Sequence, residues 1–198
     1  AAELASRLTQ AGAIVDVIMT KDARQFLTPL TFRSLTGRPV YEDMFDPSLD
    51  TPEIHVELAR RADVMVVAPA TATTIARLAH GMADEIVSLT ALASLAPLIV
   101  CPAMDSQMWG QPATKENVAI LQKREVLIVE PEEGRLASGN TGLGRLASTE
   151  IILGAIRFAL GKRDDLAGRK IVVSAGGTQE PIDPVRYIGN YSSGKMGY

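Results

Sequence analysis

Three segments of this sequence carry side chains suited to binding a cofactor and to moving a proton. His55 lies where the run PEIHVELARRAD turns to a helical pattern, and an imidazole can give or take a proton near neutral pH. The run PATATT at residues 69–74 offers hydroxyl groups at the expected start of a helix, where unpaired backbone N–H groups suit a phosphate or the edge of a flavin ring. The run PAMD at residues 102–105 ends in the carboxyl group of Asp105.

Each segment also has a structural explanation. A threonine at the start of a helix is a common N-cap, and a lone histidine on a helix, such as His55 or His80, more often has a structural role. Cys101 precedes the PAMD run in an apolar stretch, where a small core residue is the simpler interpretation. A common site therefore requires a fold that brings the segments together.

The order of the expected elements predicts such a fold. Strands are expected at residues 13–20, 63–68, 97–101 and 126–129, and helices at residues 1–12, 22–27, 75–80, 114–124 and 149–160. The strand runs lack inward and outward alternation, which is typical of a parallel sheet buried by helices on both faces. Because loops at the carboxyl ends of parallel strands meet at one edge, Thr20, the PATATT loop and the PAMD turn should share a crevice.

Composition argues against several classes of protein. The 20 Lys and Arg against 23 Asp and Glu give a net charge of -3 without a basic tract, which argues against nucleic acid as a partner. The most apolar stretch, residues 91–104, is broken by prolines and is shorter than the roughly 20 residues of a membrane-spanning helix. One cysteine excludes an internal disulfide and fits a reducing compartment. We expect a cytoplasmic protein that binds no membrane and has no metal site.

The three segments, together with GRLASGNTGLGRLA at residues 134–147, resemble the homo-oligomeric flavin-containing cysteine decarboxylases. The resemblance covers residues 1 to 160 and rests on the motifs in combination. It implies an α/β, Rossmann-like (flavodoxin-like) fold that binds flavin mononucleotide (FMN) and associates with itself as a trimer or dodecamer. In that family the cysteinyl moiety of a small-molecule substrate is oxidised by hydride transfer to the flavin, and the resulting thioaldehyde accepts electrons as carbon dioxide leaves.

Carried over residue by residue, the resemblance makes His55 the essential catalytic residue. It places Asp105 and Met104 near the carboxylate region of the substrate. The residues expected near the flavin are Thr20, Lys21, Thr71, Ala72, Thr73, Thr74 and Ala103.

Two positions depart from the family pattern. The family commonly has Pro-Ala-Met-Asn, and the carboxylate of Asp105 would repel a substrate carboxylate unless it is protonated or paired. The mobile loop usually contains Leu-Ala-Cys-Gly, and here Ser138 stands where the thiol protonates the enethiolate. A serine hydroxyl is a much weaker acid than a thiol, whose reference pKa is about 8.5. Either another acid, such as water held by Ser138, completes the reduction, or the product leaves as the enethiol.

The last part of the chain resembles a different family. The run GGTQEPIDPVRYIGNYSSGKMGY resembles the N-terminal motif of phosphopantothenate–cysteine ligases. Gly176, Gly177 and Gly194 would permit close approach to a nucleotide, and Asn190 would help convert the acyl-cytidylate intermediate. The site for CTP and Mg²⁺ would be incomplete, so we predict no ligase activity from these residues alone.

These interpretations define an expected domain organisation. A decarboxylase domain at residues 1–160 would lack its first strand, a charged linker would follow at 161–168, and a ligase fragment that starts with a strand at 169–175 would occupy 169–198. Both ends of the chain are expected to be truncated.

The leading hypothesis is FMN-dependent decarboxylation of 4'-phospho-N-pantothenoylcysteine to 4'-phosphopantetheine in coenzyme A biosynthesis. One alternative is a peptidyl-cysteine decarboxylase that stops at an aminoenethiol, which Ser138 favours but the ligase motif does not. Another is a regulatory flavoprotein that inhibits phosphatases, although the acidic tail that would favour it is not visible. A plain nucleotide-binding domain would give no reason for His55 and the PAMD run to occur together.

Overall fold

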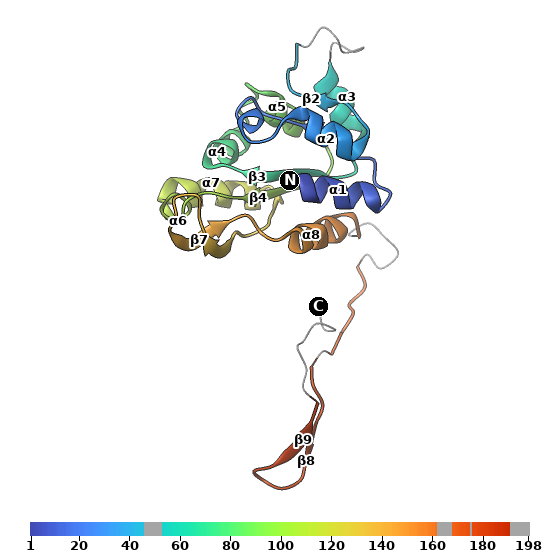
Figure 1. Ribbon diagram of the computed structural model, residues 1–198, viewed down its shortest axis with the longest axis vertical. Coiled ribbons are helices and arrows are strands. Elements are labelled where there is room, and N and C mark those ends of the chain that lie inside the picture. Colours follow the sequence, from blue (N-terminus) through green and yellow to red (C-terminus); the bar gives the residue numbers. More distant parts are fainter. Residues whose placement is uncertain (46–52, 162–167, 175, 191–198) are drawn as a thin grey trace. The chain divides into compact units, whose positions relative to one another are not determined.

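The computed structural model describes residues 1–45, 53–161, 168–174 and 176–190 (Figure 1). The chain divides into two units, Ala1–Asp164 and Asp165–Tyr198. The first unit contains the three segments singled out above, so its architecture decides how they lie relative to one another.

The first unit alternates helices with short strands. Its α-helices are α1 (Ala2–Gln10), α2 (Pro29–Thr36), α3 (Ile54–Arg61), α4 (Ala72–His80), α5 (Ile86–Ala93), α6 (Ser106–Gly110), α7 (Pro112–Lys123) and α8 (Thr149–Gly161). A short 3-10 helix, η1, spans Ala23–Gln25. The strands are β1 (Val17–Ile18), β2 (Val40–Tyr41), β3 (Met65–Ala70), β4 (Leu98–Pro102), β5 (Leu127–Ile128), β6 (Glu132–Arg135) and β7 (Thr141–Arg145).

Parallel strands form the centre of this unit. Strands β3, β4 and β5 lie in that order, with Val67 opposite Val100 and Ile99 opposite Leu127. Strands β1 and β2 form a second, two-stranded parallel sheet, while β6 and β7 form an antiparallel hairpin. The predicted α/β fold with parallel strands is therefore confirmed.

The core lies on both faces of the β3–β4–β5 sheet. Val67 and Val100 pack against buried residues of α3, α4, α5 and α7. Ile99 and Cys101 pack instead with buried residues of α1 and α8. Successive side chains of a strand point to opposite faces, which explains why neighbouring residues of β4 belong to different clusters. Figure 1 shows α8 on the other side of the sheet from α4 and α5.

Local signals explain where the helix that follows β3 begins and ends. The Thr71 side chain caps α4 by accepting the backbone N–H of Thr74 at 3.3 Å. The helix ends at Gly81, whose φ of 66° lies in the left-handed region that glycine adopts without strain. The start of α4 is thus fixed directly after the carboxyl end of β3.

The structure corrects several expected element boundaries. The helix predicted at residues 22–27 is only the 3-10 turn η1, and the regular helix α2 starts later, at Pro29. The expected strand at 13–20 is reduced to β1. Helix α5 and the β6–β7 hairpin were not predicted at all.

The second unit is described from Gly168 onward, except for residue 175 and residues 191–198. Its strands β8 (Gln179–Pro181) and β9 (Tyr187–Gly189) form an antiparallel pair. Residues 169–174 form no strand, so the strand predicted there is wrong over that range. Most of the predicted linker, and Gly194 of the glycine-rich motif, lie outside the described residues. None of the described helices is long and apolar enough to cross a membrane.

Candidate active site

The carboxyl ends of β3 and β4 bring two of the predicted segments together. Ala70 at the end of β3 is in register with Pro102 at the end of β4, and the Ala103 N–H donates to the Ala70 carbonyl at 3.0 Å. Thr71 and Ala103 are therefore the first residues beyond two neighbouring strand ends. The PATATT loop and the PAMD turn lie side by side at this edge of the sheet.

The PATATT loop presents hydroxyl and N–H groups at the start of α4. The Thr71 and Thr74 hydroxyl oxygens lie 3.1 Å apart, and the first backbone bond of the helix runs from Ile75 N–H to the Thr71 carbonyl at 3.0 Å. The N–H groups of Ala72 and Thr73 come before this bond and so have no partner within the helix. The structural N-cap role of Thr71 and a ligand-binding role for the loop are compatible. This donor set fits a phosphate or the polar edge of a flavin.

Thr20 and Lys21 follow strand β1 but are not joined to the other segments by a hydrogen bond among the described residues. The Thr20 hydroxyl oxygen instead accepts the Ala23 N–H at 3.1 Å, and Lys21 is exposed. Strand β1 is paired with β2 and not with β3. Their predicted place beside the flavin therefore stays a prediction.

His55 lies in the first turn of α3 and is half-buried. Its Nδ1 atom is buried and has no hydrogen-bond partner among the described residues. Buried polar atoms are nearly always paired in folded proteins, so an unpaired ring nitrogen is an open position for a ligand or a transferable proton. No hydrogen bond links His55 to the PATATT loop or to Asp105 within the described part of the chain.

Helix α3, which carries His55, is fixed to strands β1 and β2 by a network of charged side chains. Arg61 Nε lies 2.8 Å from Asp16 Oδ2, and an Arg61 terminal nitrogen donates to the Tyr41 hydroxyl at 3.0 Å. Asp16 also accepts from Arg38 at 2.7 Å. The sequence pattern gave no signal for this network, because its members lie far apart along the chain.

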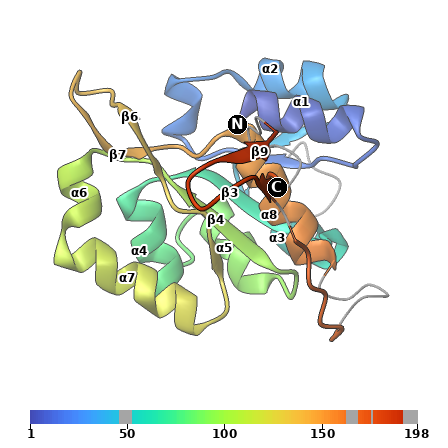
Figure 2. The same cartoon turned by 90° about the horizontal axis from the view of Figure 1, so that it is seen from below.

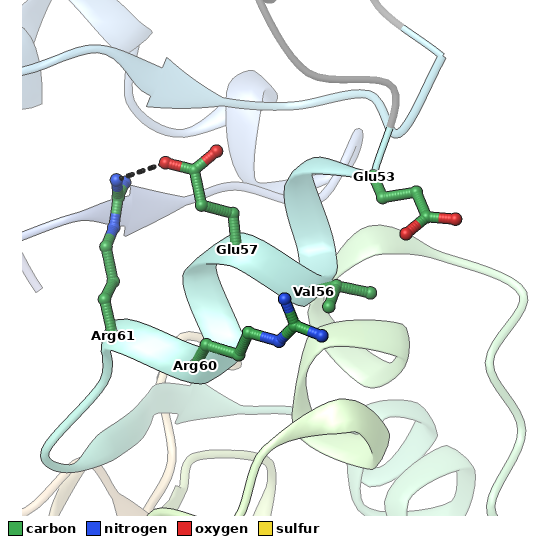
Figure 3. A pocket seen from close by; sticks show the side chains of 5 residues that line it. All are labelled: Glu53, Val56, Glu57, Arg60 and Arg61. Carbon is green, nitrogen blue, oxygen red and sulfur yellow. Dashed lines mark hydrogen bonds and ion pairs between the residues drawn. The ribbon is translucent and has the colours of Figure 1, made fainter.

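A hollow beside α3 is a second place to consider for a site. It is lined by Glu53, Val56, Glu57, Arg60 and Arg61 (Figure 3). The lining carries charges of both signs, and Glu57 and Arg61 pair with each other at 3.0 Å. None of the predicted site residues lines it, so we place the candidate site at the carboxyl ends of β3 and β4 and not in this hollow.

The two residues that depart from the family pattern contact each other. The Ser138 hydroxyl donates to Asp105 Oδ2 at 2.8 Å, and the Gln107 backbone N–H donates to Asp105 Oδ1 at 3.0 Å. Both bonds lower the pKa of the Asp105 carboxyl, and the bond from Gln107 has the larger effect. Asp105 is therefore a carboxylate at neutral pH, and Ser138 is the donor of the pair.

The β6–β7 hairpin, which carries Ser138, lies against the PAMD turn. The Met104 N–H donates to the Gly144 carbonyl at 3.0 Å, and Figures 1 and 2 show β7 beside α6. A Cβ atom on Gly144 would collide with the Met104 carbonyl oxygen. Met104, predicted at the substrate, is thus held by the hairpin and is half-buried.

The remaining predicted residue, Asn190, belongs to the second unit, where it is exposed and follows β9. Among the described residues, no group of three or more His, Cys, Asp or Glu side chains could hold a metal ion. The candidate site of the first unit is therefore built from hydroxyl, amide, imidazole and carboxylate groups.

Residues 1–160 match the family described as Flavoprotein. The chain belongs to this family. Residues 166–198 match a second description, the DNA/pantothenate metabolism flavoprotein C-terminal domain. The predicted resemblance to flavin-containing decarboxylases is confirmed by the matches to individual proteins that follow.

Two curated relatives carry the name coenzyme A biosynthesis bifunctional protein CoaBC. The protein of Mycobacterium tuberculosis is 47% identical over 197 residues, which cover 97% of this chain and 46% of the relative. The protein of Vibrio parahaemolyticus is 46% identical over 198 residues, which cover 100% of this chain and 49% of the relative. The chain thus spans about half the length of these relatives.

Two solved structures share the fold of the first unit. A PPC decarboxylase variant complexed with pantothenoylaminoethenethiol superimposes with a TM-score of 0.71 and 31% identity, covering 79% of this chain and 88% of that chain. The FMN-dependent cysteine decarboxylase SpaF gives a TM-score of 0.68 and 31% identity, covering 80% of this chain and 86% of that chain. The Rossmann-like fold implied by the sequence is confirmed.

Proposed function

We propose that this chain is the decarboxylase part of a coenzyme A biosynthesis protein and acts on 4'-phospho-N-pantothenoylcysteine, with 4'-phosphopantetheine as the product. The observation that carries the proposal is the similarity at 47% identity to a bifunctional coenzyme A protein over 97% of the chain, a range that includes parts of both units. The similarity to a PPC decarboxylase structure supports the same reaction for the first unit.

FMN is the proposed cofactor, and the edge formed by β3 and β4 has groups that fit it. Thr71, Thr73 and Thr74 would offer hydroxyl groups, and the N–H groups of Ala72 and Thr73 would complete the donor set. Ala103, directly beside the end of β3, would line the same edge, with Thr20 and Lys21 as further candidates. When bound, the flavin would supply a two-electron acceptor, which a carboxylate on a saturated carbon needs before it can lose carbon dioxide.

His55 is the proposed proton-transfer residue. Its imidazole would take or return a proton, which this ring does efficiently near neutral pH. Packing of the buried Ile54 and Leu58 fixes the helix that carries it. Since His55 has no bond to the PATATT loop among the described residues, self-association as a trimer or dodecamer is part of the proposal, because a neighbouring copy would complete the site.

Asp105 and Met104 are proposed to orient the substrate. Asp105 is charged at neutral pH, so a substrate carboxylate placed directly against it would be repelled. We therefore assign Asp105 to an N–H group of the substrate and not to its carboxylate. Met104, held at its backbone by Gly144, would offer an apolar wall.

The second candidate function is decarboxylation of a peptide C-terminal cysteine. SpaF, a cysteine decarboxylase, is as similar in sequence to this chain as the PPC decarboxylase is, and Ser138 favours a product that leaves as the enethiol. Residues 166–198 match a pantothenate metabolism domain, which favours the coenzyme A substrate. In the rest of such a protein, CTP and Mg²⁺ would serve the ligase, with Asn190 contributing to that site.

The test is incubation of the full-length protein with 4'-phospho-N-pantothenoylcysteine and, separately, with a peptide ending in cysteine, followed by mass spectrometry. We expect carbon dioxide to be lost from the first substrate and not from the second. Loss from the peptide alone would favour the second candidate. Bound flavin without loss from either substrate would contradict both and favour a regulatory flavoprotein.

A further inference from the structure

We propose that Ser138 and Asp105 form a hydroxyl–carboxylate latch that holds the tip of the β6–β7 hairpin against the turn after β4. Ser138 is then a positioning residue and not the acid that protonates the product. The statement about the acid rests on the proposed decarboxylase function, whereas the latch itself does not.

Both oxygens of the Asp105 carboxylate are engaged. Oδ2 accepts the Ser138 hydroxyl at 2.8 Å, and Oδ1 accepts the Gln107 N–H at 3.0 Å. A carboxylate offers two acceptor oxygens, whereas an asparagine amide offers one oxygen and one donor group. An asparagine at this position could not accept both bonds in the same orientation. With Ser138 as the donor, the latch therefore depends on aspartate at position 105, because asparagine could bond to Ser138 only in the reverse direction, from its amide to the hydroxyl oxygen.

The tip of the hairpin is a compact turn closed by two backbone hydrogen bonds. The Leu136 N–H donates to the Asn140 carbonyl at 2.8 Å, and the Gly139 N–H donates to the Leu136 carbonyl at 3.0 Å. Leu136 is buried, and Gly139 has a φ of 89°, in the left-handed region that favours glycine. Because the turn is closed by its own backbone bonds, the bond from Ser138 adds to the packing of Leu136 in holding the tip.

The base of the hairpin is held separately from the tip. The Met104 N–H bonds to the Gly144 carbonyl, and a Cβ atom on Gly142 would lie 3.0 Å from the side chain of Ser106. These contacts involve backbone atoms and glycine positions, so they do not depend on Ser138. Loss of the latch should free the tip and leave the base in place.

The latch also determines what the Ser138 proton can do. The proton is directed at the carboxylate of Asp105, and the negative charge of that carboxylate disfavours ionisation of the hydroxyl. A thiol at position 138 would meet the same charge, which would raise its pKa and weaken it as an acid. Asp105 and Ser138 thus suit each other. Asp105 would not suit the cysteine of the family pattern at position 138, and Ser138 would not bond in the same way to the asparagine of the family pattern at position 105.

Amide hydrogen exchange on the full-length, flavin-loaded protein tests the latch without using activity. We expect Ser138→Ala and Asp105→Ala each to speed exchange of the Leu136 and Gly139 amides about fivefold, the effect of losing one hydrogen bond. The double variant should be no faster than either single variant. Ser138→Thr keeps the hydroxyl and should retain slow exchange.

Thr141→Ala is the matched control, because it removes a hydroxyl three residues further along that has no hydrogen bond among the described residues. It should leave the tip unchanged, and the Met104 amide at the base should stay protected in every variant. Unchanged exchange at the tip in Ser138→Ala and Asp105→Ala, equal to that of the control, would overturn the latch.

Product mass tests the second part of the inference. Ser138→Ala should give the same ratio of phosphopantetheine to enethiol as the unmodified protein, because another group supplies the proton. A shift to the enethiol, which is two hydrogens lighter, in Ser138→Ala but not in Ser138→Thr would make Ser138 the acid and overturn the assignment. If the unmodified protein releases no carbon dioxide, the proposed function fails, and the exchange rates still decide the latch.

Discussion

Replacing Arg61 by alanine tests how the helix that carries His55 is fixed. Arg61 ends α3 and contacts three side chains: Asp16 at 2.8 Å, the Tyr41 hydroxyl at 3.0 Å and Glu57 at 3.0 Å. Asp16 directly precedes β1, and Tyr41 belongs to β2. One guanidinium group therefore joins α3 to Tyr41 of β2 and to Asp16, the residue before β1.

The expected loss of stability follows from these contacts. The ion pair with Asp16 has side-chain exposures of 33% and 17%, and after solvent screening it contributes about 1 kcal/mol. The hydrogen bond to the buried Tyr41 contributes about 1 kcal/mol, and the i,i+4 pair with Glu57 about 0.4 kcal/mol. Asp16 keeps its bond to Arg38. We expect Arg61→Ala to lower the free energy of unfolding by about 2 to 3 kcal/mol.

Urea denaturation of the flavin-loaded protein measures this loss. Arg60→Ala is the control, because Arg60 is the exposed neighbour of Arg61 on the same helix, and it should cost less than about 0.5 kcal/mol. The turnover number of Arg61→Ala should also fall, because His55 is less firmly placed. Equal losses in the two variants would refute the conclusion that Arg61 anchors α3.

Four further outcomes are expected. His55→Asn should lower the rate of decarboxylation about 100-fold or more while flavin absorbance is retained. The control His80→Asn should stay active. An active His55→Asn variant would show that His55 is not a catalytic residue. Thr71→Ala should lower the free energy of unfolding, measured by thermal denaturation, by about 1 kcal/mol because the N-cap is lost. It should also weaken flavin binding. Thr71→Ser should restore both the stability and the binding. Because the pKa of Asp105 is lowered, the latch is fully formed at and above the ordinary carboxyl pKa and is lost as the pH falls through the lowered value. Protection of the hairpin-tip amides, corrected for intrinsic exchange, should therefore be constant from about pH 5 to 8. A loss of protection within that range would contradict the lowered pKa. Burial raises the pKa of the Cys101 thiol to about 12, so it should react with a disulfide reagent at pH 8 only after denaturation, and rapid labelling of the native protein would show that β4 is more open than described.

The convergence of Thr71 and Ala103 could be predicted from the sequence because it follows from parallel pairing alone. Two apolar runs that each lead into a loop and helix place their following residues at one edge of the sheet, and the register of Ala70 with Pro102 confirms that geometry. The helical start at His55 was predicted for a similarly local reason. Its unpaired Nδ1 could not be predicted, because burial of one ring atom depends on packing between distant elements.

The sequence analysis missed helix α5 and the β6–β7 hairpin for different reasons. The sequence IVSLTALA of α5 is apolar on nearly all sides, so it lacks the 3.6-residue alternation by which helices are recognised. Strands β6 (EEGR) and β7 (TGLGR) lack β-branched pairs, and glycine favours neither strand. The hairpin lies against the turn after β4, and Gly144 permits that close approach. For this reason the bond between Ser138 and Asp105 could not be predicted from the sequence either.

The burial of Cys101 makes the chain suited to optical measurement of hairpin motion. Residues 1–198 contain one cysteine, and it is fully enclosed in β4. Ala137, next to Ser138, is exposed at the hairpin tip. In an Ala137→Cys variant, the new thiol would be the accessible one of two among residues 1–198 and could carry a fluorescent dye. Opening and closing of the tip could then be timed in real time during single turnovers.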